Sequence, residues 1–317
     1  TALVEWPVAI SGSYDMHFLE VPAEALISSM QDHQKYFPVV DGHGKLLPHF
    51  ITVANIASND PQQIKAGNER VIRARLEDAV FFWNQDRKQT LHSRAAQLDG
   101  MTFQKRLGSL GDKQTRIAAI ATALAGQLGF NVEQVQRAAS LCKCDLVTSM
   151  VFEFPDLQGI MGRYYALHDG EDEAVARALD EQYQPRFAGD ALPASDTGQA
   201  LAIAERLDTL VGIFAIGQTP TGDKDPFGLR RSALGLLRIL IERQLDLDLR
   251  VFIDTAASNF PADLDAASIG DPLFSFMMDR LRAWYLDAGY DVHVFEAVLA
   301  RQPQRPLDFD QRMRAVR

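Results

Sequence analysis

The spacing of apolar residues changes near Asp60, and this change restricts the fold more than any other feature of the chain. Before Asp60, apolar residues alternate or form short continuous runs, a pattern typical of β-strands. After it they recur every three or four positions, which indicates amphipathic helices. The sequence therefore predicts a mainly α protein that begins with a small strand-rich α+β segment. The helical windows are 115–128, 132–152, 173–182, 197–216, 226–244, 273–288 and 292–300.

The first 56 residues contain four runs that read as strands, at 4–10, 17–21, 36–40 and 50–56. A short helix is expected at 23–30. Residues 41–44 form a predicted hairpin turn, since Gly42 and Gly44 can adopt positive φ. Beyond them, Asp60 and Pro61 supply a helix start. The long helix that follows is expected to reach about Gln97, with its apolar residues on one face, namely Val71, Leu76, Val80 and Trp83.

Three parts are predicted along the chain. Residues 1–60 form the strand-rich segment, as part of a domain cut at its N-terminus, and residues 61–258 form a helical domain. Residues 259–317 form a C-terminal helical appendage, because the stretch 259–272 is rich in Asp, Ala and Ser and reads as a boundary. The chain opens on Thr1 with a strand-like run, so we expect it to be an internal piece of a longer protein.

Composition narrows the classes of function. A chain of 47% apolar and 23% charged residues is ordinary for a globular protein, and it has no apolar window of about 20 residues and no signal peptide. Cys142 and Cys144 lie too close together for a disulfide framework, which fits a reducing, cytoplasmic location. The net charge of −10 argues against nucleic-acid binding over a whole face, so any RNA contact must be local.

Two arginine clusters are the candidates for such a contact. One consists of Arg70, Arg73 and Arg75, and the other of Arg230, Arg231 and Arg238. Both clusters lie among acidic residues, so pairing with neighbouring carboxylates is the competing interpretation; the carboxylates are Glu69, Glu77, Asp223 and Asp225.

His168 and Asp169 are the pair most suggestive of chemistry. An adjacent His and Asp bind a divalent metal in phosphohydrolases of the HD type, together with a distant His and a distant Asp. Here the pair is followed by Gly170 and Glu171, which indicates a helix end and a loop. No Walker-type phosphate loop, Rossmann fingerprint or serine nucleophile elbow occurs.

Two helical segments resemble the metal-binding helices of the HD family, at residues 137–147 and 202–210. In that alignment Cys142 and Lys143 replace the His-Asp doublet, and Asp208 stands where the last carboxylate would be. A charged lysine cannot be a metal ligand, and no His occurs at 112–116, where the first ligand is expected. The resemblance implies an HD-like helical domain whose metal site is lost, so phosphohydrolase activity becomes the weaker alternative.

Residues 222–238, GDKDPFGLRRSALGLLR, combine a well-specified helix start with three arginines. Asp225 can cap the helix and Pro226 can occupy its first turn. A helix start with arginines nearby suits phosphate or carboxylate recognition. The alternative is that Arg230 or Arg231 pairs internally with an acidic residue, the candidates being Asp223, Asp225 and Asp208.

Several long runs resemble the β subunit of bacterial two-subunit glycyl-tRNA synthetases, and together they span almost the whole chain. These runs are DHQKYFP at 32–38, FITVANI at 50–56, GNERVIR at 67–73, AVFFWNQDRK at 79–88, KCDLV at 143–147, FEF at 152–154, QGIMG at 158–162, EQYQPRFAGD at 181–190 and the segment 222–238.

The resemblance implies a division of labour. In that family the α subunit activates glycine with ATP and magnesium, while the β subunit contributes tRNA recognition and assembly of a heterotetramer. This chain would have no catalytic residue, metal or cofactor of its own, and its partners would be the α subunit and tRNA(Gly), with no membrane. The predicted tRNA contacts are Arg70, Arg73, Arg75, Lys143, Lys224, Arg230 and Arg231. A third alternative is a module that docks the α subunit or neighbouring β domains, which an exposed apolar patch on the strand-rich start or the C-terminal helices would favour.

Overall fold

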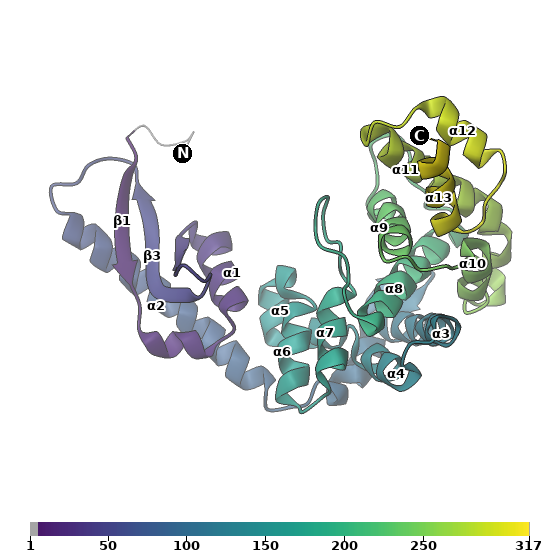
Figure 1. The fold of residues 1–317 in the computed structure, drawn as a ribbon. Coiled ribbons are helices and arrows are strands. Elements are labelled where there is room, and N and C mark those ends of the chain that lie inside the picture. The colour runs from purple at the N-terminus through teal and green to yellow at the C-terminus, as the bar shows by residue number, and fades with distance from the viewer. Residues whose placement is uncertain (1–5, 317) are drawn as a thin grey trace.

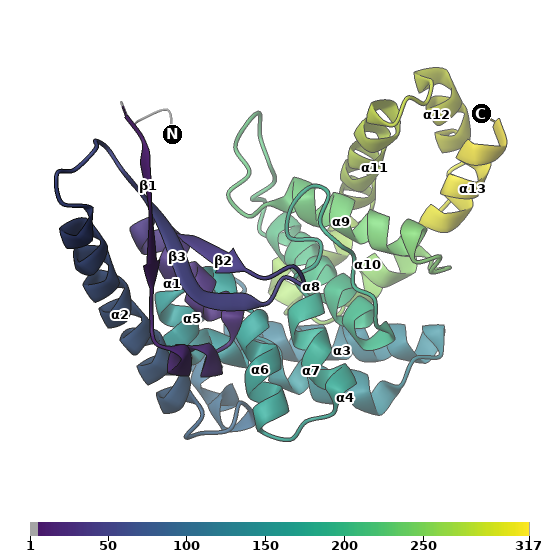
Figure 2. The same ribbon diagram turned by 60° about the vertical axis from the view of Figure 1, so that its left-hand side comes forward.

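The computed structural model describes residues 6–316, including every side chain among them except those of 32–34, and it is mainly helical. At the N-terminal end β1 (Val8–Ser13), β3 (Leu46–Ala54) and β2 (Phe37–Val40) form an antiparallel sheet in that order. The helices α1 (Ala23–Gln34) and α2 (Pro61–Asp86) contact the sheet and each other. We call this sheet, together with α1 and α2, the strand-rich lobe. Figures 1 and 2 show it at one end of the molecule and the C-terminal helices at the other.

Three of the predicted strands differ in the structure, and the one predicted at 50–56 lies at Leu46–Ala54. Residues 17–21 are wrong as a strand, because they belong to the 3-10 helix η1 (Met16–Glu20), which begins where the Asp15 side chain accepts a hydrogen bond from the backbone N–H of His17. The first strand starts at Val8 and continues to Ser13, and residues 4 and 5 lie outside the described part. The predicted turn is confirmed, since the Asp41 carboxylate accepts from the N–H groups of His43 and Lys45.

The long helix begins as predicted but ends earlier. Asp60 caps α2 through the backbone N–H of Gln63, with Pro61 at the first position. The helix stops at Asp86, not near Gln97, and the 3-10 helix η2 (His92–Gly100) follows. It stops there because the buried Asp86 carboxylate turns to the N–H groups of Ser149 and Met150. The buried residues of α2 also differ from the prediction, since Val71 is exposed and its neighbour Ile72 is buried.

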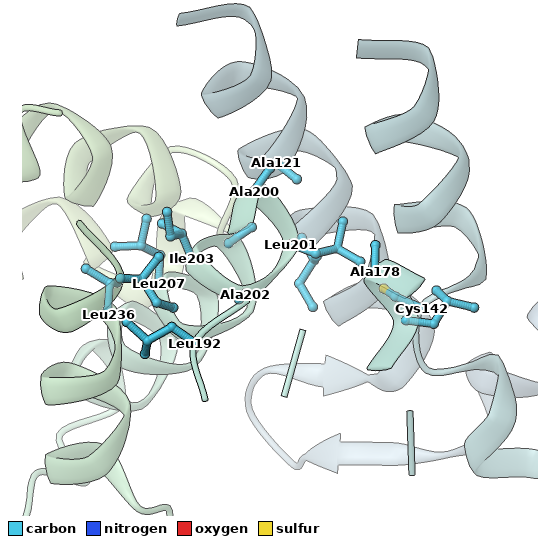
Figure 3. Packing of buried hydrophobic residues seen from close by; sticks show 14 of the residues in the cluster. Ala121, Cys142, Ala178, Leu192, Ala200, Leu201, Ala202, Ile203, Leu207 and Leu236 are labelled. Atoms are coloured by element: carbon cyan, nitrogen blue, oxygen red, sulfur yellow. The ribbon is translucent and has the colours of Figure 1, made fainter. Parts of the chain in front are cut away.

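The helical body is arranged around α8 (Asp196–Ala215), which is buried along almost its whole length. It packs against α3 (Leu110–Leu128), α4 (Val132–Leu141), α7 (Glu173–Glu181) and α9 (Leu229–Glu242). Figure 3 shows Leu201, Ile203 and Leu207 of α8 packed among side chains from these neighbours. The windows at 115–128, 173–182 and 197–216 are thus confirmed, and α6 (Ile160–His168) is a helix that the periodicity did not reveal.

The window 132–152 is wrong as one helix. The helix α4 ends at Leu141, Lys143 takes a left-handed conformation with φ of 71°, and η3 (Cys144–Val147) and α5 (Ser149–Glu153) follow. The break turns the Asp145 carboxylate inward, where it accepts a hydrogen bond from the backbone N–H of Gly159 at 2.6 Å. A tertiary hydrogen bond therefore replaces the helix that the apolar spacing predicts.

The C-terminal part consists of α10 (Leu249–Ala257), α11 (Gly270–Asp287), α12 (Val292–Leu299) and α13 (Pro306–Val316). The windows for α11 and α12 are confirmed, whereas α10 was not predicted. Both α11 and α13 pack on α9, and η6 (Ala266–Ile269) packs on α8. The domain boundaries at 60 and 258 stay predictions. The short elements β4 (Thr102–Gln104), β5 (Gly108–Ser109), η4 (Pro155–Leu157) and η5 (Ala262–Leu264) complete the fold.

No helix in the described part of the chain has the length and apolar character needed to cross a membrane.

Candidate functional site

A cluster of buried charges joins α3 to α8. Lys113 Nζ lies 2.8 Å from Asp208 Oδ2 and 2.7 Å from Thr209 Oγ1. Arg116 Nε donates to the other oxygen of Asp208 at 2.5 Å. Because charges buried away from water are tolerated only when they are paired, this carboxylate is held by two cations. The cluster therefore fixes α3 on α8 through polar contacts.

Glu205, one helical turn before Asp208, extends the cluster toward the surface. Its carboxylate lies 3.5 Å from Lys113 Nζ and 3.6 Å from Lys143 Nζ. Desolvation alone would raise the pKa of Glu205, but the charges of Lys113, Lys143 and Arg206 lower it to about 2. The resemblance to the HD family predicted that Lys143 and Asp208 lie close together. In the structure they belong to one cluster, because Lys143 contacts Glu205 and Lys113 contacts both Glu205 and Asp208.

The residues at this centre do not fit a divalent metal. Lys113, Lys143 and Arg116 point at the two carboxylates, and their positive charges stand where a metal ion would have to be. Burial raises the pKa of the Cys142 thiol to about 12, so it is a poor source of a thiolate ligand. Among the residues that the structure describes, no group of three or more His, Cys, Asp or Glu side chains could hold a metal.

His168 and Asp169 lie elsewhere, at the end of α6. His168 is the last residue of the helix, and the Asp169 carboxylate accepts a hydrogen bond from the backbone N–H of Leu91 at 2.6 Å. The doublet therefore ends a helix and anchors the segment that follows α2, as the adjacent Gly170 indicated. It shares no contact with the cluster around Asp208.

A polar hollow of about 350 Å³ opens beside Glu205. Its wall includes Arg231 and Ser232 of α9, Arg186 from the loop before α8, and Arg206 of α8. The Arg206 guanidinium donates to four backbone carbonyls, those of Gln182, Tyr183, Pro185 and Ala202. The hollow thus places the start of α9 next to the buried cluster.

The sequence did not single out Arg186 or Arg206. Arg186 lies in the run EQYQPRFAGD, which served only as a mark of the family, and Arg206 lies in the helical segment that contains Asp208. An arginine between Glu205 and Asp208 in a mostly apolar helix is the signal that could have identified Arg206, because buried arginines are rare unless paired.

The start of α9 leaves arginine side chains available. Asp225 accepts hydrogen bonds from the backbone N–H groups of Leu229 and Arg230 at 2.8 and 2.9 Å, so its capping role is confirmed. The helix begins at Leu229 after Gly228, which places Pro226 outside it and corrects the predicted start. Gly228 allows this start because its φ of 62° suits a residue without a side chain.

Internal pairing of Arg230 and Arg231 with the proposed carboxylates is wrong. The Arg230 guanidinium donates to the Gly222 carbonyl, and Asp208 is held by Lys113 and Arg116. Within residues 6–316, no carboxylate with a described position lies within 4.0 Å of the Arg230 or Arg231 guanidinium. Both positive charges are thus free to meet an external anion.

The other predicted contacts are not in one place. Arg70 and Arg73 are exposed on α2, and Arg75 lies 3.8 Å from Asp78. The Glu69 carboxylate accepts a hydrogen bond from the backbone N–H of Ser13 and lies 3.8 Å from Lys65 Nζ, so it does not pair with these arginines. This helix belongs to the strand-rich lobe, away from α9 in Figure 1. Lys224 is exposed in the turn before α9, close in sequence to Arg230.

Lys143 departs from the prediction. Its side chain is only 4% exposed, with the ammonium 3.6 Å from Glu205 and 4.1 Å from the centre of the Tyr183 ring. A buried lysine held between a carboxylate and an aromatic face has no route to a phosphate. The structure therefore groups Lys224, Arg230 and Arg231, leaves the α2 arginines apart and places Lys143 in the interior.

The fold and this site define a mainly α protein. The buried carboxylates of its central cluster are paired with lysine and arginine side chains, and the arginines at the start of α9 have no carboxylate partner among the described residues. Residues 1–300 match the family described as glycyl-tRNA synthetase beta subunit. The chain belongs to that family.

Curated relatives agree over the whole chain. It is 56% identical over 316 residues to the glycine–tRNA ligase beta subunit of Klebsiella pneumoniae (strain 342), and the match covers 100% of this chain and 46% of the relative. The beta subunits of Sodalis glossinidius (strain morsitans) and Salmonella schwarzengrund (strain CVM19633) are also 56% identical, over 316 and 315 residues. The chain therefore spans less than half the length of these relatives.

Proposed function

We propose that this chain is part of the β subunit of a cytoplasmic two-subunit glycyl-tRNA synthetase. It supports the ATP-dependent attachment of glycine to tRNA(Gly) through tRNA recognition and subunit assembly, within an α/β heterotetramer. The observation that carries this proposal is the family match over residues 1–300, together with 56% identity over the whole chain to proteins named as glycine–tRNA ligase beta subunits.

The proposal gives this chain no adenylation chemistry. ATP and magnesium are used by the α subunit, in keeping with the lack of a phosphate-binding loop in the sequence. The cations around Glu205 and Asp208 already pair with those carboxylates. These cations are therefore not free to bind the phosphates of a nucleoside triphosphate. The cluster instead holds α3, α8 and the turn at Lys143 together.

The tRNA contact is placed at the start of α9. Arg231 is exposed without a protein partner in the described part of the chain, Arg230 is held only by a backbone carbonyl, and Lys224 is exposed nearby. A guanidinium of this kind matches the geometry of a phosphate. The arginines of α2 form a second, separate contact. Lys143 is not part of this proposal, because it is buried.

Charge reversal in the assembled enzyme tests the proposal. Arg230→Glu and Arg231→Glu should each weaken tRNA binding and lower the steepness of its dependence on salt, by about 1 in the log–log slope for each phosphate that is no longer neutralised. Arg70→Glu and Arg73→Glu test the second contact in the same way. The matched control is Arg177→Glu, an exposed arginine of α7 that pairs with Glu173. If all four reversals bind tRNA as tightly as the control, the assigned contacts are wrong.

A docking role has its own observation in the strand-rich lobe. Phe37 and Ile51 are 56% and 37% exposed, and they face each other across the β2–β3 pair. Such an apolar patch on a sheet indicates a protein contact. We propose that this face contributes to subunit assembly by docking the α subunit or a neighbouring β-subunit domain.

Assembly is measured separately from tRNA binding. Phe37→Glu should weaken association of the subunits in analytical ultracentrifugation, because a charge would be buried at the contact. Val251→Glu serves as the control, since Val251 is 52% exposed on α10 and lies outside the sheet. Equal association of both variants would remove this face from the assembly role.

A further inference from the structure

A second hollow lies next to the polar one and shares Pro185 and Arg231 with it. We call it the α9–α11 groove, after the two helices that form its walls, and define it by Phe187, Arg230, Arg231, Arg238, Arg280 and Trp284. Its volume of about 350 Å³ lies within the range of pockets that hold small organic groups. Phe187 belongs to the loop between α7 and α8, so three segments distant in sequence meet here.

Aromatic surface is available in this groove. The Phe187 side chain is 62% exposed, although burial of a phenylalanine is strongly favourable. Trp284 is half-buried on α11 and packs its ring edge-on against Tyr285, at 5.0 Å between ring centres. An exposed aromatic face accepts a nucleobase regardless of its sequence, because every base has a π-face.

Arginines surround these rings. Arg231 has no protein partner among the described residues, and the buried Nε of Arg280 has no hydrogen-bond acceptor there. Arg238 is paired with Glu242, and Arg230 donates to the Gly222 carbonyl. Asp287 is the one acidic residue in the groove lining. The groove therefore carries a local positive excess on a chain of net charge −10.

Aromatic faces set among arginines are the combination that binds unpaired nucleic acid, with bases on the rings and phosphates on the guanidiniums. A paired helix does not expose its base faces in this way, whereas loops and ends do. An apolar peptide would leave the free arginines without counter-charges, so the charge pattern favours RNA over a protein segment.

We propose that the α9–α11 groove binds an unpaired nucleotide of the tRNA, with its base packed against the rings of both Phe187 and Trp284 and its phosphate held by Arg231 and Arg280. This rests on the proposed tRNA-binding function and deepens it, from an arginine contact to a base-stacking site. Phosphate contacts and stacking respond differently to salt, so the two proposals can fail separately.

The experiment measures tRNA affinity of the assembled enzyme at several salt concentrations. Phe187→Ala and Trp284→Ala should each weaken binding, roughly 5- to 150-fold for the loss of one stacked base, with little change in the salt slope. Trp284→Phe should restore most of the affinity, because the ring is kept. Phe152→Ala, which removes an 84% exposed ring on α5 outside the groove, is the control and should bind as the unmodified enzyme does.

The arginine side of the groove is tested by Arg280→Gln, which should weaken binding and reduce the salt slope by about 1. A tRNA shortened by its unpaired 3′ nucleotides identifies the occupant. If Phe187→Ala weakens binding of intact tRNA but not of shortened tRNA, the 3′ end occupies the groove; equal weakening of both assigns a loop nucleotide. Either outcome supports the groove.

Two results would overturn the stacking site. Both alanine variants could bind tRNA as the Phe152→Ala control does, while Arg230→Glu and Arg231→Glu still weaken binding; the tRNA contact would then stand without the groove. Alternatively, the alanine variants could bind tRNA normally but lose association with the α subunit, which would make the groove a protein-docking site.

Discussion

Lys113 Nζ and Asp208 Oδ2 lie 2.8 Å apart on α3 and α8, with 3% and 0% of their side chains exposed. Arg116 shares the same carboxylate. Removing one member of a buried, hydrogen-bonded pair leaves a charge in a medium of low polarity, which costs far more than the net contribution of the intact pair. The packing of α3 on α8 therefore depends on the balance of charges within the cluster.

Replacing Lys113 with methionine should lower the free energy of unfolding by about 3–5 kcal/mol. The variant leaves Asp208 with Arg116 alone and removes one of the two ammonium groups beside Glu205. Urea unfolding followed by circular dichroism measures the change. Arg177→Met is the matched control: its pair with Glu173 is exposed, so a decrease of no more than about 1 kcal/mol is expected. Equal decreases in the two variants would contradict a structural role for the cluster.

Glu205 should make stability depend on pH below about 5. Its pKa falls from 4.5 to about 2 on folding, so the folded state favours the ionised form. The contribution is fully present above pH 4.5 and is lost as the pH falls from 4.5 toward 2. A shift of this size corresponds to an upper value on the order of 3 kcal/mol.

The control for this prediction is Glu205→Gln, measured by urea unfolding at pH 7, 5, 4 and 3. The stability difference between the parent chain and the variant should be constant from pH 7 to 5 and then shrink. Other carboxylates titrate in the same range, but they are common to both proteins and cancel in the difference. A difference that stays unchanged down to pH 3 would show that Lys113 and Lys143 do not hold down the pKa of Glu205.

Local sequence signals predicted much of the helical part. Asp60 with Pro61 at α2 and the apolar spacing of α7 and α8 were sufficient, because capping and periodicity are properties of neighbouring residues. The failures occur where distant residues decide. The helix predicted over 132–152 breaks at Lys143 because Asp145 bonds to Gly159, and α2 ends at Asp86 because that carboxylate caps Ser149 and Met150.

The same distinction between neighbouring and distant residues applies to the candidate site. The arginines at the start of α9 could be identified from the sequence, since Asp225 marks the helix start beside them, although Pro226 lies outside the helix. The α9–α11 groove could not, because Phe187 and Trp284 come together only through tertiary packing. The burial of Lys143 was missed for the same reason: its nearest carboxylate, Glu205, is more than sixty residues away in sequence.

The two cysteines should be unreactive in the folded chain. Burial raises the pKa of Cys142 to about 12 and that of Cys144 to about 11, so the thiolate fraction at pH 8 is very small. Labelling with iodoacetamide at pH 8 should therefore be slow under native conditions and fast in urea. Fast native labelling of either thiol would contradict its buried position after the end of α4.

A side chain at position 12 should lower the free energy of unfolding. It lies on β1 against the ring of Phe50, and a Cβ at this position would come within 2.3 Å of the Phe50 Cζ. The Phe50 ring is fully buried, so it cannot move aside freely, and Gly12→Ala should cost about 1–3 kcal/mol in the free energy of unfolding. Gly126→Ala is the matched control, because Gly126 lies in α3 with no atom within 4 Å of its added Cβ. That substitution should stabilise the chain by up to about 1 kcal/mol, since alanine is the better helix former. Opposite signs for the two changes in urea unfolding would confirm the packing of β1 on Phe50, and a stabilising effect of Gly12→Ala would contradict it.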